Sequence, residues 1–307
     1  MSSASAPAKL ILCGEHAVVY GRPAIAVPLS DVRAYAEVAS AARGAGLRFH
    51  APDLGEDWSA DGQPEHPLSE LARAVLARLG APNDDLSITL RSDIPIASGL
   101  GSGAAIGTAL VRALAARLGA TLPPDEVAAL VYASERRYHG TPSGIDNTVV
   151  AYEQPIWFVR RAPAPLIEPL AIGAPLTLLV GDTGVRSATR LPVGAVRERW
   201  QADRARYEAL FDQVGELVTQ ARTALAAGDA PLLGRLLDAN QVLLEQIGVS
   251  SPELERLVAA ARTAGALGAK LSGAGWGGVM LALVTPETRD NVAEALRGAG
   301  ATRVLGA

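Results

Sequence analysis

A glycine-rich segment in the first third of the chain has the composition of a phosphate-binding loop. It runs Pro95-Ile-Ala-Ser-Gly-Leu-Gly-Ser-Gly-Ala-Ala105 and continues into an apolar stretch. Glycines at positions 99, 101 and 103 let the backbone approach a ligand closely and adopt positive φ. The free N–H groups and positive dipole end of a following helix favour a bound phosphate. The segment therefore predicts phosphate binding, with a tight helix-packing turn as the alternative.

Two other nucleotide motifs fit this segment poorly. A Walker A loop requires Gly-Lys-Ser/Thr after four residues, and the segment contains no lysine. The residue pattern Gly99-x-Gly101-x-x-Ala104 matches the dinucleotide fingerprint. However, eight residues separate Gly99 from the apolar run that ends at Leu90, which is too many for that motif. The acidic strand end expected about 20 residues further on is also missing. A dinucleotide-dependent oxidoreductase is therefore disfavoured.

A second segment, His139-Gly-Thr-Pro-Ser-Gly-Ile-Asp-Asn147, presents carboxylates beside a turn. Asp146 follows the Gly/Pro/Ser turn, and Glu135 lies just upstream on a predicted helix. Phosphoryl transfer needs one carboxylate for Mg²⁺ and one that accepts or orients a hydroxyl proton. Aspartate at such a place is also typical of a helix cap. Spacing alone leaves both roles open.

Lysine is almost absent from the chain. Of 28 basic residues only Lys9 and Lys270 are lysines, and they lie in the glycine-containing segments 7–16 and 270–278. Lysine offers a compact ammonium whose pKa responds to its surroundings, whereas arginine offers a wide, always charged fork. GC-rich coding would explain the low count without any function. The functional interpretation is a close cation beside a phosphate or a reacting hydroxyl, and for Lys270 a structural role is left open.

Composition excludes several classes of protein. The 307 residues are 49% hydrophobic and 20% charged, which is typical of a globular protein with room for two domains. A net charge of −4 argues against a nucleic-acid partner. The uncharged stretch 94–111 contains four glycines and a proline, so a membrane helix is a poor interpretation.

The single cysteine and the N-terminus indicate a cellular compartment. Cys13 lies in an apolar run and is predicted to be a small buried hydrophobe rather than a nucleophile. A lone cysteine allows no internal disulfide, which fits a reducing cytoplasm. The first residues lack the charged and apolar regions of a signal peptide. We therefore expect a cytoplasmic protein with no membrane association.

The predicted elements mix strands and helices without strict βαβ alternation, which indicates the α+β class. Strands are predicted at 10–13, 24–29, 32–38, 86–90, 155–159, 176–180 and within 270–284. Helices are predicted at 67–80, 102–118, 125–138 and over most of 192–264, before a final helix and strand. The Pro- and Ala-rich run 161–165 is the best linker candidate, so we predict domains 1–165 and 166–307.

Taken in order, these segments resemble the GHMP kinase superfamily and, within it, the mevalonate kinase branch. The resemblance spans nearly the whole chain and is carried by residues 7–26, 99–105, 139–146 and 270–278, and by Asp182–Gly184 with Arg186, Thr189 and Arg190. It implies a ribosomal S5 domain 2-like N-terminal domain and a ferredoxin-like C-terminal domain. The implied activity is ATP-dependent phosphorylation of the 5-hydroxyl of mevalonate in isoprenoid precursor biosynthesis, with Mg²⁺ bound.

The same resemblance implies a role for individual residues. Asp146 would be the catalytic carboxylate, and Lys9 would lower the pKa of the hydroxyl and stabilise charge on the transferring phosphoryl group. Glu135 and Ser102 would hold Mg²⁺. The substrate mevalonate would contact Glu15, His16, Ile145 and Thr183, with Arg186 and Arg190 as candidates for its carboxylate. The ATP phosphates would contact Pro95, Ser98, Gly99, Leu100, Gly101, Ser102, Gly103 and Ala104.

Two positions depart from the family pattern. Gly103 stands where the family loop has a second serine that binds Mg²⁺, so Ser102 or a water must replace that ligand. Trp276 interrupts a run of four glycines, and its indole is expected either to narrow the pocket or to shift specificity.

Alternative functions follow from these departures. One is a GHMP kinase for another small alcohol or for phosphomevalonate. Another is a weakly active ligand-sensing relative, against which the intact set of Lys9, Glu135 and Asp146 argues. A homodimer is left open.

Overall fold

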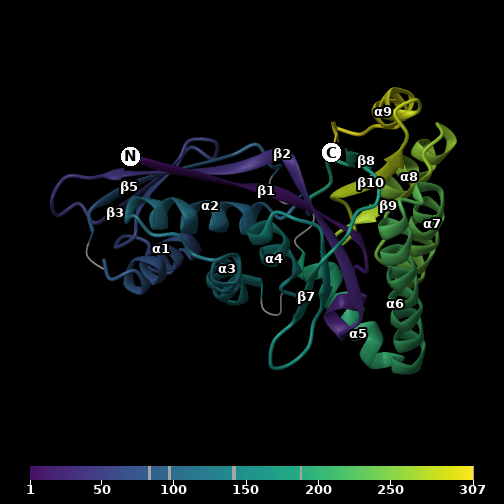
Figure 1. Cartoon of the computed structure of the whole chain (residues 1–307), viewed down its shortest axis with the longest axis horizontal. Helices are drawn as coiled ribbons and strands as arrows, with labels where there is room; N and C mark the ends of the chain where they lie inside the picture. Colours follow the sequence, from purple (N-terminus) through teal and green to yellow (C-terminus); the bar gives the residue numbers. More distant parts are fainter. Residues whose placement is uncertain (82–83, 96–97, 140–142, 187–188, 307) are drawn as a thin grey trace. The chain divides into compact units, whose positions relative to one another are not determined.

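Two long strands, β1 (Ser2–Cys13) and β2 (Pro23–Ser40), give residues to both of the units into which the chain divides. The structure, a computed structural model, describes residues 1–81, 84–95, 98–139, 143–186 and 189–306 (Figure 1). The first unit contains Met1–Lys9, Pro28–Ile96 and Gly101–Glu153, and the second contains Leu10–Val27, Ala97–Leu100 and Gln154–Ala307. A family domain boundary after residue 165 stays a prediction, because these units alternate along the chain.

In the first unit, helices pack against a mixed sheet that contains both antiparallel and parallel strand pairs. Its strands are β3 (Leu47–Ala51), β4 (Glu56–Ser59) and β5 (Leu86–Ser92), ordered β4-β3-β5-β2, with β1 pairing β2. Its helices are α1 (Pro67–Arg78), α2 (Ser102–Arg117), α3 (Pro124–His139) and α4 (Ile145–Tyr152). Helix α2 contacts α1, α3, α4 and β5 (Figure 1). The prediction that this apolar helix is buried is thus confirmed.

Burial along β2 follows the predicted alternation. Val32, Ala34, Ala36 and Val38 are buried, and the residues between them keep part of their surface exposed. The strands predicted separately at 24–29 and 32–38 form one continuous strand. Because its pairing with β5 runs from Ala34 to Ser40, one face of this stretch covers the core of the first unit.

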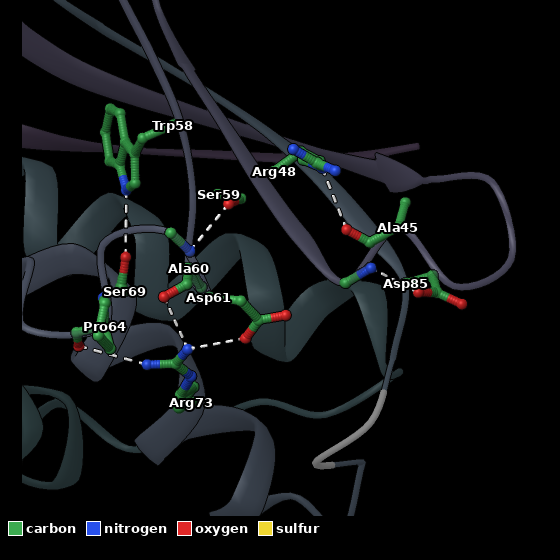
Figure 2. A network of polar contacts seen from close by, with 12 residues as sticks. Ala45, Arg48, Trp58, Ser59, Ala60, Asp61, Pro64, Ser69, Arg73 and Asp85 are labelled. Atoms are coloured by element: carbon green, nitrogen blue, oxygen red, sulfur yellow. Dashed lines mark hydrogen bonds and ion pairs between the residues drawn. The ribbon is translucent and has the colours of Figure 1, made fainter.

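A hairpin that the sequence did not indicate, β3–β4, is fastened to α1 by polar contacts (Figure 2). Trp58 stacks on Phe49 with ring centroids 4.8 Å apart, and its indole Nε1 donates to Ser69 Oγ at 3.1 Å. Arg73 Nη2 donates to the backbone oxygen of Ala60 at 2.7 Å. The buried indole therefore has its hydrogen-bond partner, as a buried Trp requires.

The second unit contains an antiparallel sheet in the order β11-β8-β10-β9. These strands are β8 (Thr177–Asp182), β9 (Gly268–Ser272), β10 (Val279–Val284) and β11 (Arg303–Gly306). The remaining strands, β6 (Ile156–Val159) and β7 (Leu166–Pro169), pair with each other, and β6 pairs with residues 23–26 of β2. A 3₁₀ helix, η1 (Ala17–Tyr20), precedes β2.

The α-helices of the second unit follow β8 in the chain. They are α5 (Arg190–Ala202), α6 (Arg204–Ala227), α7 (Ala230–Ile247), α8 (Pro252–Thr263) and α9 (Arg289–Gly298). Helices α7 and α8 contact β9, and α9 contacts β8 and β11 (Figure 1). Within the described residues, no helix has the length and apolar character needed to span a bilayer.

Helix α7 approaches β9 closely because glycines meet at the contact. A Cβ on Gly234 would lie 2.2 Å from the backbone oxygen of Leu267, and one on Gly268 would lie 2.0 Å from the oxygen of Gly234. No side chain fits at either position. Gly194, also inside a helix, has nothing within 4 Å of a built Cβ.

These two helical glycines predict opposite effects of the same substitution. Gly234→Ala should lower the free energy of unfolding by about 3 kcal/mol, because α7 must move off β9. Gly194→Ala should raise it by about 0.5–1 kcal/mol through helix propensity. Urea denaturation of both variants measures the difference. Equal effects would show that α7 does not pack on β9 at this distance.

Candidate active site

The first unit contains an ion pair between a buried lysine and a partly exposed aspartate that were predicted to act together. Lys9 Nζ lies 2.9 Å from Asp146 Oδ1, with side chains 3% and 35% exposed, respectively. Lys9 is the last residue of β1 that belongs to the first unit, and Asp146 is in the first turn of α4. The lysine is therefore enclosed while the carboxylate keeps a surface that a ligand can reach.

Helix α4 explains how Asp146 is held. Its N-cap is Gly144, with φ of +89°, and this cap forms no side-chain hydrogen bond. Asp146 is therefore a first-turn residue near the positive end of the helix and not its cap. Ile145, predicted to contact substrate, is fully buried in the first unit. Residues 140–142 of the predicted motif lie outside the described residues.

A second carboxylate, Glu135 of α3, faces Gly103 of the glycine-rich segment 95–105. Glu135 Oε1 would lie 3.8 Å from a Cβ built on Gly103, the position where the family pattern has serine. Burial and the negative charge of Asp146 raise the pKa of Glu135 to about 8, while Lys9 lowers it. Because this pKa lies above 7, Glu135 is mostly protonated near pH 7 when no further cation is present, and Lys9 pairs with the Asp146 carboxylate.

The start of α2 presents backbone N–H groups beside Lys9. Gly101 is the N-cap, with φ of +75°, and forms no side-chain cap. A Cβ on Gly101 would lie 2.7 Å from Lys9 Cγ and 3.0 Å from Lys9 Cε. The lysine stem therefore packs on the glycine backbone. Ser102, Gly103 and Ala104 form the first turn, whose N–H groups have no partner within the helix.

The second unit gathers the other half of the predicted loop. Ser98 and Gly99 line a small cavity together with Thr189 and part of the segment 272–278, here named the β9–β10 glycine loop. The loop residues that line it are Ser272, Ala274, Gly275, Gly277 and Gly278. A Cβ on Gly278 would lie 2.7 Å from the oxygen of Ser98. Ser98 and Leu100 are buried, and Pro95 is half-buried. Ile96 and Ala97 lie outside the described residues.

Two predicted substrate residues hold this glycine loop. Nε2 of His16 donates to the oxygen of Ala274 at 2.9 Å, since a carbonyl only accepts. Thr183 Oγ1 donates to the oxygen of Gly278 at 2.8 Å, and the Thr183 N–H donates to the same atom at 2.9 Å. Burial lowers the pKa of His16 to about 4, so its ring is neutral near pH 7.

The other lysine also forms an ion pair, which the sequence did not indicate. Lys270 Nζ on β9 contacts the carboxylate of Glu15, and both side chains are 0% exposed. The same ammonium donates to the oxygen of Leu271 at 2.6 Å. Gln241 Oε1 accepts the Leu271 N–H at 2.8 Å. Glu15, predicted to contact substrate, is thus enclosed and held by Lys270.

Other predicted residues have structural partners. Cys13 is fully buried, as predicted, and burial raises the pKa of its thiol to about 12. Both amino groups of Arg186 donate to the carboxylate of Asp182, at 2.9 and 3.0 Å. Arg190 begins α5 and is exposed. Arg186 is therefore occupied, and Arg190 is the more accessible of the two candidates for a substrate carboxylate.

Comparison with known proteins identifies the family that the chain resembles. The family model described as GHMP kinases N terminal domain matches residues 67–154, and the one described as GHMP kinases C terminal matches residues 221–302. A mevalonate kinase of Thermococcus sibiricus is 36% identical over 324 residues, covering 98% of this chain and 94% of the relative.

Solved structures share the fold. The crystal structure of L. major mevalonate kinase in complex with R-mevalonate matches with a TM-score of 0.85 at 32% identity, covering 100% of this chain and 95% of that chain. A Streptococcus pneumoniae phosphomevalonate kinase in complex with phosphomevalonate and AMPPNP matches with a TM-score of 0.85 at 18% identity, covering 100% of both chains. The two-domain α+β fold predicted from the sequence is confirmed.

The Lys270–Glu15 pair predicts strong coupling in stability. Lys270→Met should lower the free energy of unfolding by about 3–5 kcal/mol, because it leaves a carboxylate buried without its cation. The double variant Lys270→Met/Glu15→Gln should lose less than Lys270→Met alone. Arg289→Met, which breaks an exposed pair with Asp290, should change little. Additive losses in chemical denaturation would contradict the coupling.

Neutral His16 predicts a dependence of stability on pH. Its pKa is depressed in the folded state relative to 6.5, so the unfolded chain binds the proton first as pH falls. The stabilisation is complete above about pH 6.5 and is lost toward pH 4, by about 3 kcal/mol for this group. Unfolding of wild type and His16→Asn should therefore give a stability difference that shrinks as pH falls across this range. A constant difference would contradict a neutral His16.

Proposed function

The chain belongs to the GHMP kinase family, and we propose that it transfers the γ-phosphoryl group of ATP to the 5-hydroxyl of mevalonate. The product would be mevalonate 5-phosphate, an isoprenoid precursor. The observation that carries the proposal is the Lys9–Asp146 ion pair beside the first turn of α2. The choice of mevalonate is supported by relatives named mevalonate kinase over 98% of the chain.

Asp146 and Lys9 would have separate roles at the reacting hydroxyl, one as proton acceptor and one as a stabilising cation. The Asp146 carboxylate would accept the hydroxyl proton as the oxygen bonds to the γ-phosphorus and the bond to ADP breaks. The Lys9 ammonium would stabilise negative charge on the hydroxyl oxygen and the phosphoryl group. Its enclosed stem fixes the ammonium in place, so no reorganisation is needed during the reaction.

The two halves of the glycine segment would hold phosphates through their backbone. The N–H groups of Ser102, Gly103 and Ala104 point from the start of α2, where the helix dipole favours an anion. Ser98 and Gly99 would add contacts from the cavity they line with the β9–β10 glycine loop. Mevalonate would be contacted by Glu15, His16, Ile145 and Thr183. Since all four are buried, we expect them to act through shape and hydrogen bonding more than through proton exchange.

The residues present fit a partly hydrated Mg²⁺. Burial and the charge of Asp146 raise the pKa of Glu135, and a divalent cation beside these carboxyl groups would favour the ionised form of Glu135. Magnesium binds through one or two carboxylates plus nucleotide phosphates and keeps several waters. Glu135 and the Ser102 hydroxyl would therefore hold it, with water at the place that Gly103 leaves without a hydroxyl. When bound, the ion would offset negative charge on the phosphates.

Substrate identity is tested by direct turnover. Purified protein should release ADP with ATP, Mg²⁺ and mevalonate in a coupled assay, and should release little with phosphomevalonate or galactose. Removal of Mg²⁺ with a chelator should stop the reaction. Faster turnover of phosphomevalonate would move the assignment to that substrate. No ADP release at any Mg²⁺ concentration would favour a ligand-sensing relative.

The proposed roles of Asp146 and Lys9 predict a loss of kcat when either residue is replaced. Asp146→Asn should lower kcat by about 10²–10⁴-fold, because the amide cannot take the proton. Lys9→Arg should lower kcat by about 10²-fold although charge is kept, because the Lys9 stem packs closely on Gly101 and the wider guanidinium should be displaced from the ammonium position. Circular dichroism should show both variants folded. Near-normal kcat in Lys9→Arg would show that charge alone is sufficient.

A further inference from the structure

Trp276 lies in the middle of the β9–β10 glycine loop with an unusual backbone conformation. Its φ of +56° is in the left-handed region, which disfavours any residue with a Cβ. The loop positions around it, Gly275 at +83° and Gly277 at +123°, carry no such penalty. A tryptophan at this position therefore requires compensating contacts.

Those contacts come from the C-terminal end of α7. The Trp276 indole Nε1 donates to the oxygen of Gly248 at 3.0 Å, and its backbone N–H donates to the oxygen of Val249 at 2.9 Å. The guanidinium carbon of Arg199 lies 5.9 Å from the centroid of the indole ring. We name Trp276, Arg199 and Gly248 the Trp276 cluster.

Arg199 completes the cluster from helix α5. Its Nη1 donates to the oxygens of Ile247 and Gly248, both at 3.0 Å. These are among the last carbonyls of α7, which have no partner within the helix. The cluster thus satisfies a helix end and fixes the glycine loop with the same groups.

The Trp276 side chain does not line the cavity beside Ser98. In the described part of the chain, the cavity beside Ser98 is lined by Ser272, Ala274, Gly275, Gly277 and Gly278, and Trp276 is not among its lining residues. A Cβ on Gly275 would lie 2.0 Å from the oxygen of Val249, so the loop packs directly on the turn after α7. The expected narrowing of the pocket by the indole is therefore not what this geometry favours.

We propose that Trp276 is a positioning residue that orders the β9–β10 glycine loop before substrates bind. A loop of glycines loses much conformational freedom when it closes on a ligand. His16 holds it at Ala274 and Thr183 holds it at Gly278, and Trp276 fixes the stretch between them. Ordering in the free protein removes that loss from binding, so the effect falls on KM. This inference rests on the proposed function.

Loop ordering and turnover are measured on the same variants. Trp276→Gly should speed amide hydrogen exchange in a peptide covering residues 272–278. It should also raise KM for ATP or mevalonate on the order of tenfold, with kcat within about threefold. Trp276→Phe keeps the ring but loses the indole N–H, so its KM should rise less, by about threefold.

Trp200→Phe is the matched control. Trp200 is also half-buried, donates its indole N–H to Glu208 at 2.9 Å and lies under an arginine, Arg204, but it is on α5 and does not bond to the loop. It should lose stability without changing KM or exchange at 272–278. Merely structural packing of Trp276 would give the same result for both tryptophans.

The inference is overturned if Trp276→Gly leaves loop exchange and KM as in wild type. A fall in kcat at constant KM, or a KM change equal to that of Trp200→Phe, also overturns it. If wild type does not phosphorylate mevalonate, the proposed function fails. The exchange comparison then still decides whether Trp276 orders the loop, because it needs no substrate.

Discussion

A charged ammonium group in a protein interior is strongly unfavourable unless an opposite charge lies beside it, and this constraint applies to both lysines of the chain. The side chains of Lys9 and Lys270 are 3% and 0% exposed, and they form ion pairs with Asp146 and Glu15, respectively. An unpaired charge in such a place would be strongly unfavourable. The strands that hold the lysines must therefore deliver them to elements far away in sequence. One pair forms in each unit.

The two pairs differ in what solvent can reach. Asp146 keeps about a third of its side chain exposed and stands in the first turn of a short helix, so a ligand can approach it. Glu15 and Lys270 are both 0% exposed, which leaves them no direct access to bulk water. The same type of lysine–carboxylate ion pair is thus suited to two different roles. The open pair is suited to proton transfer, whereas the closed pair is suited to holding β9 and the segment after β1 in fixed positions.

Sequence reasoning was most successful where a local pattern decides the outcome. The alternation of residues 32–38, the apolar character of α2 and the burial of Cys13 follow from residue type and period alone. A helix start near Asp146 was considered, but no range was predicted for α4, which has only eight residues and begins at Ile145 after a turn-rich segment. The β3–β4 hairpin was missed because β3 pairs in parallel with the distant β5. The Glu15–Lys270 pair carried no local signal, since 255 residues separate its members.

Glycine-rich loops combine two properties that oppose each other. Removing side chains lets Gly275 and Gly278 approach Val249 and Ser98 more closely than any Cβ would allow. The same removal gives the backbone many conformations, which a ligand would have to restrict. In the β9–β10 loop the neighbouring side chains counter this freedom, because His16, Thr183 and Trp276 each form a hydrogen bond to or from the loop. Close approach is therefore kept without leaving the backbone free. The sequence signature of such a loop includes these anchoring residues, although only the glycines are recognisable as a motif.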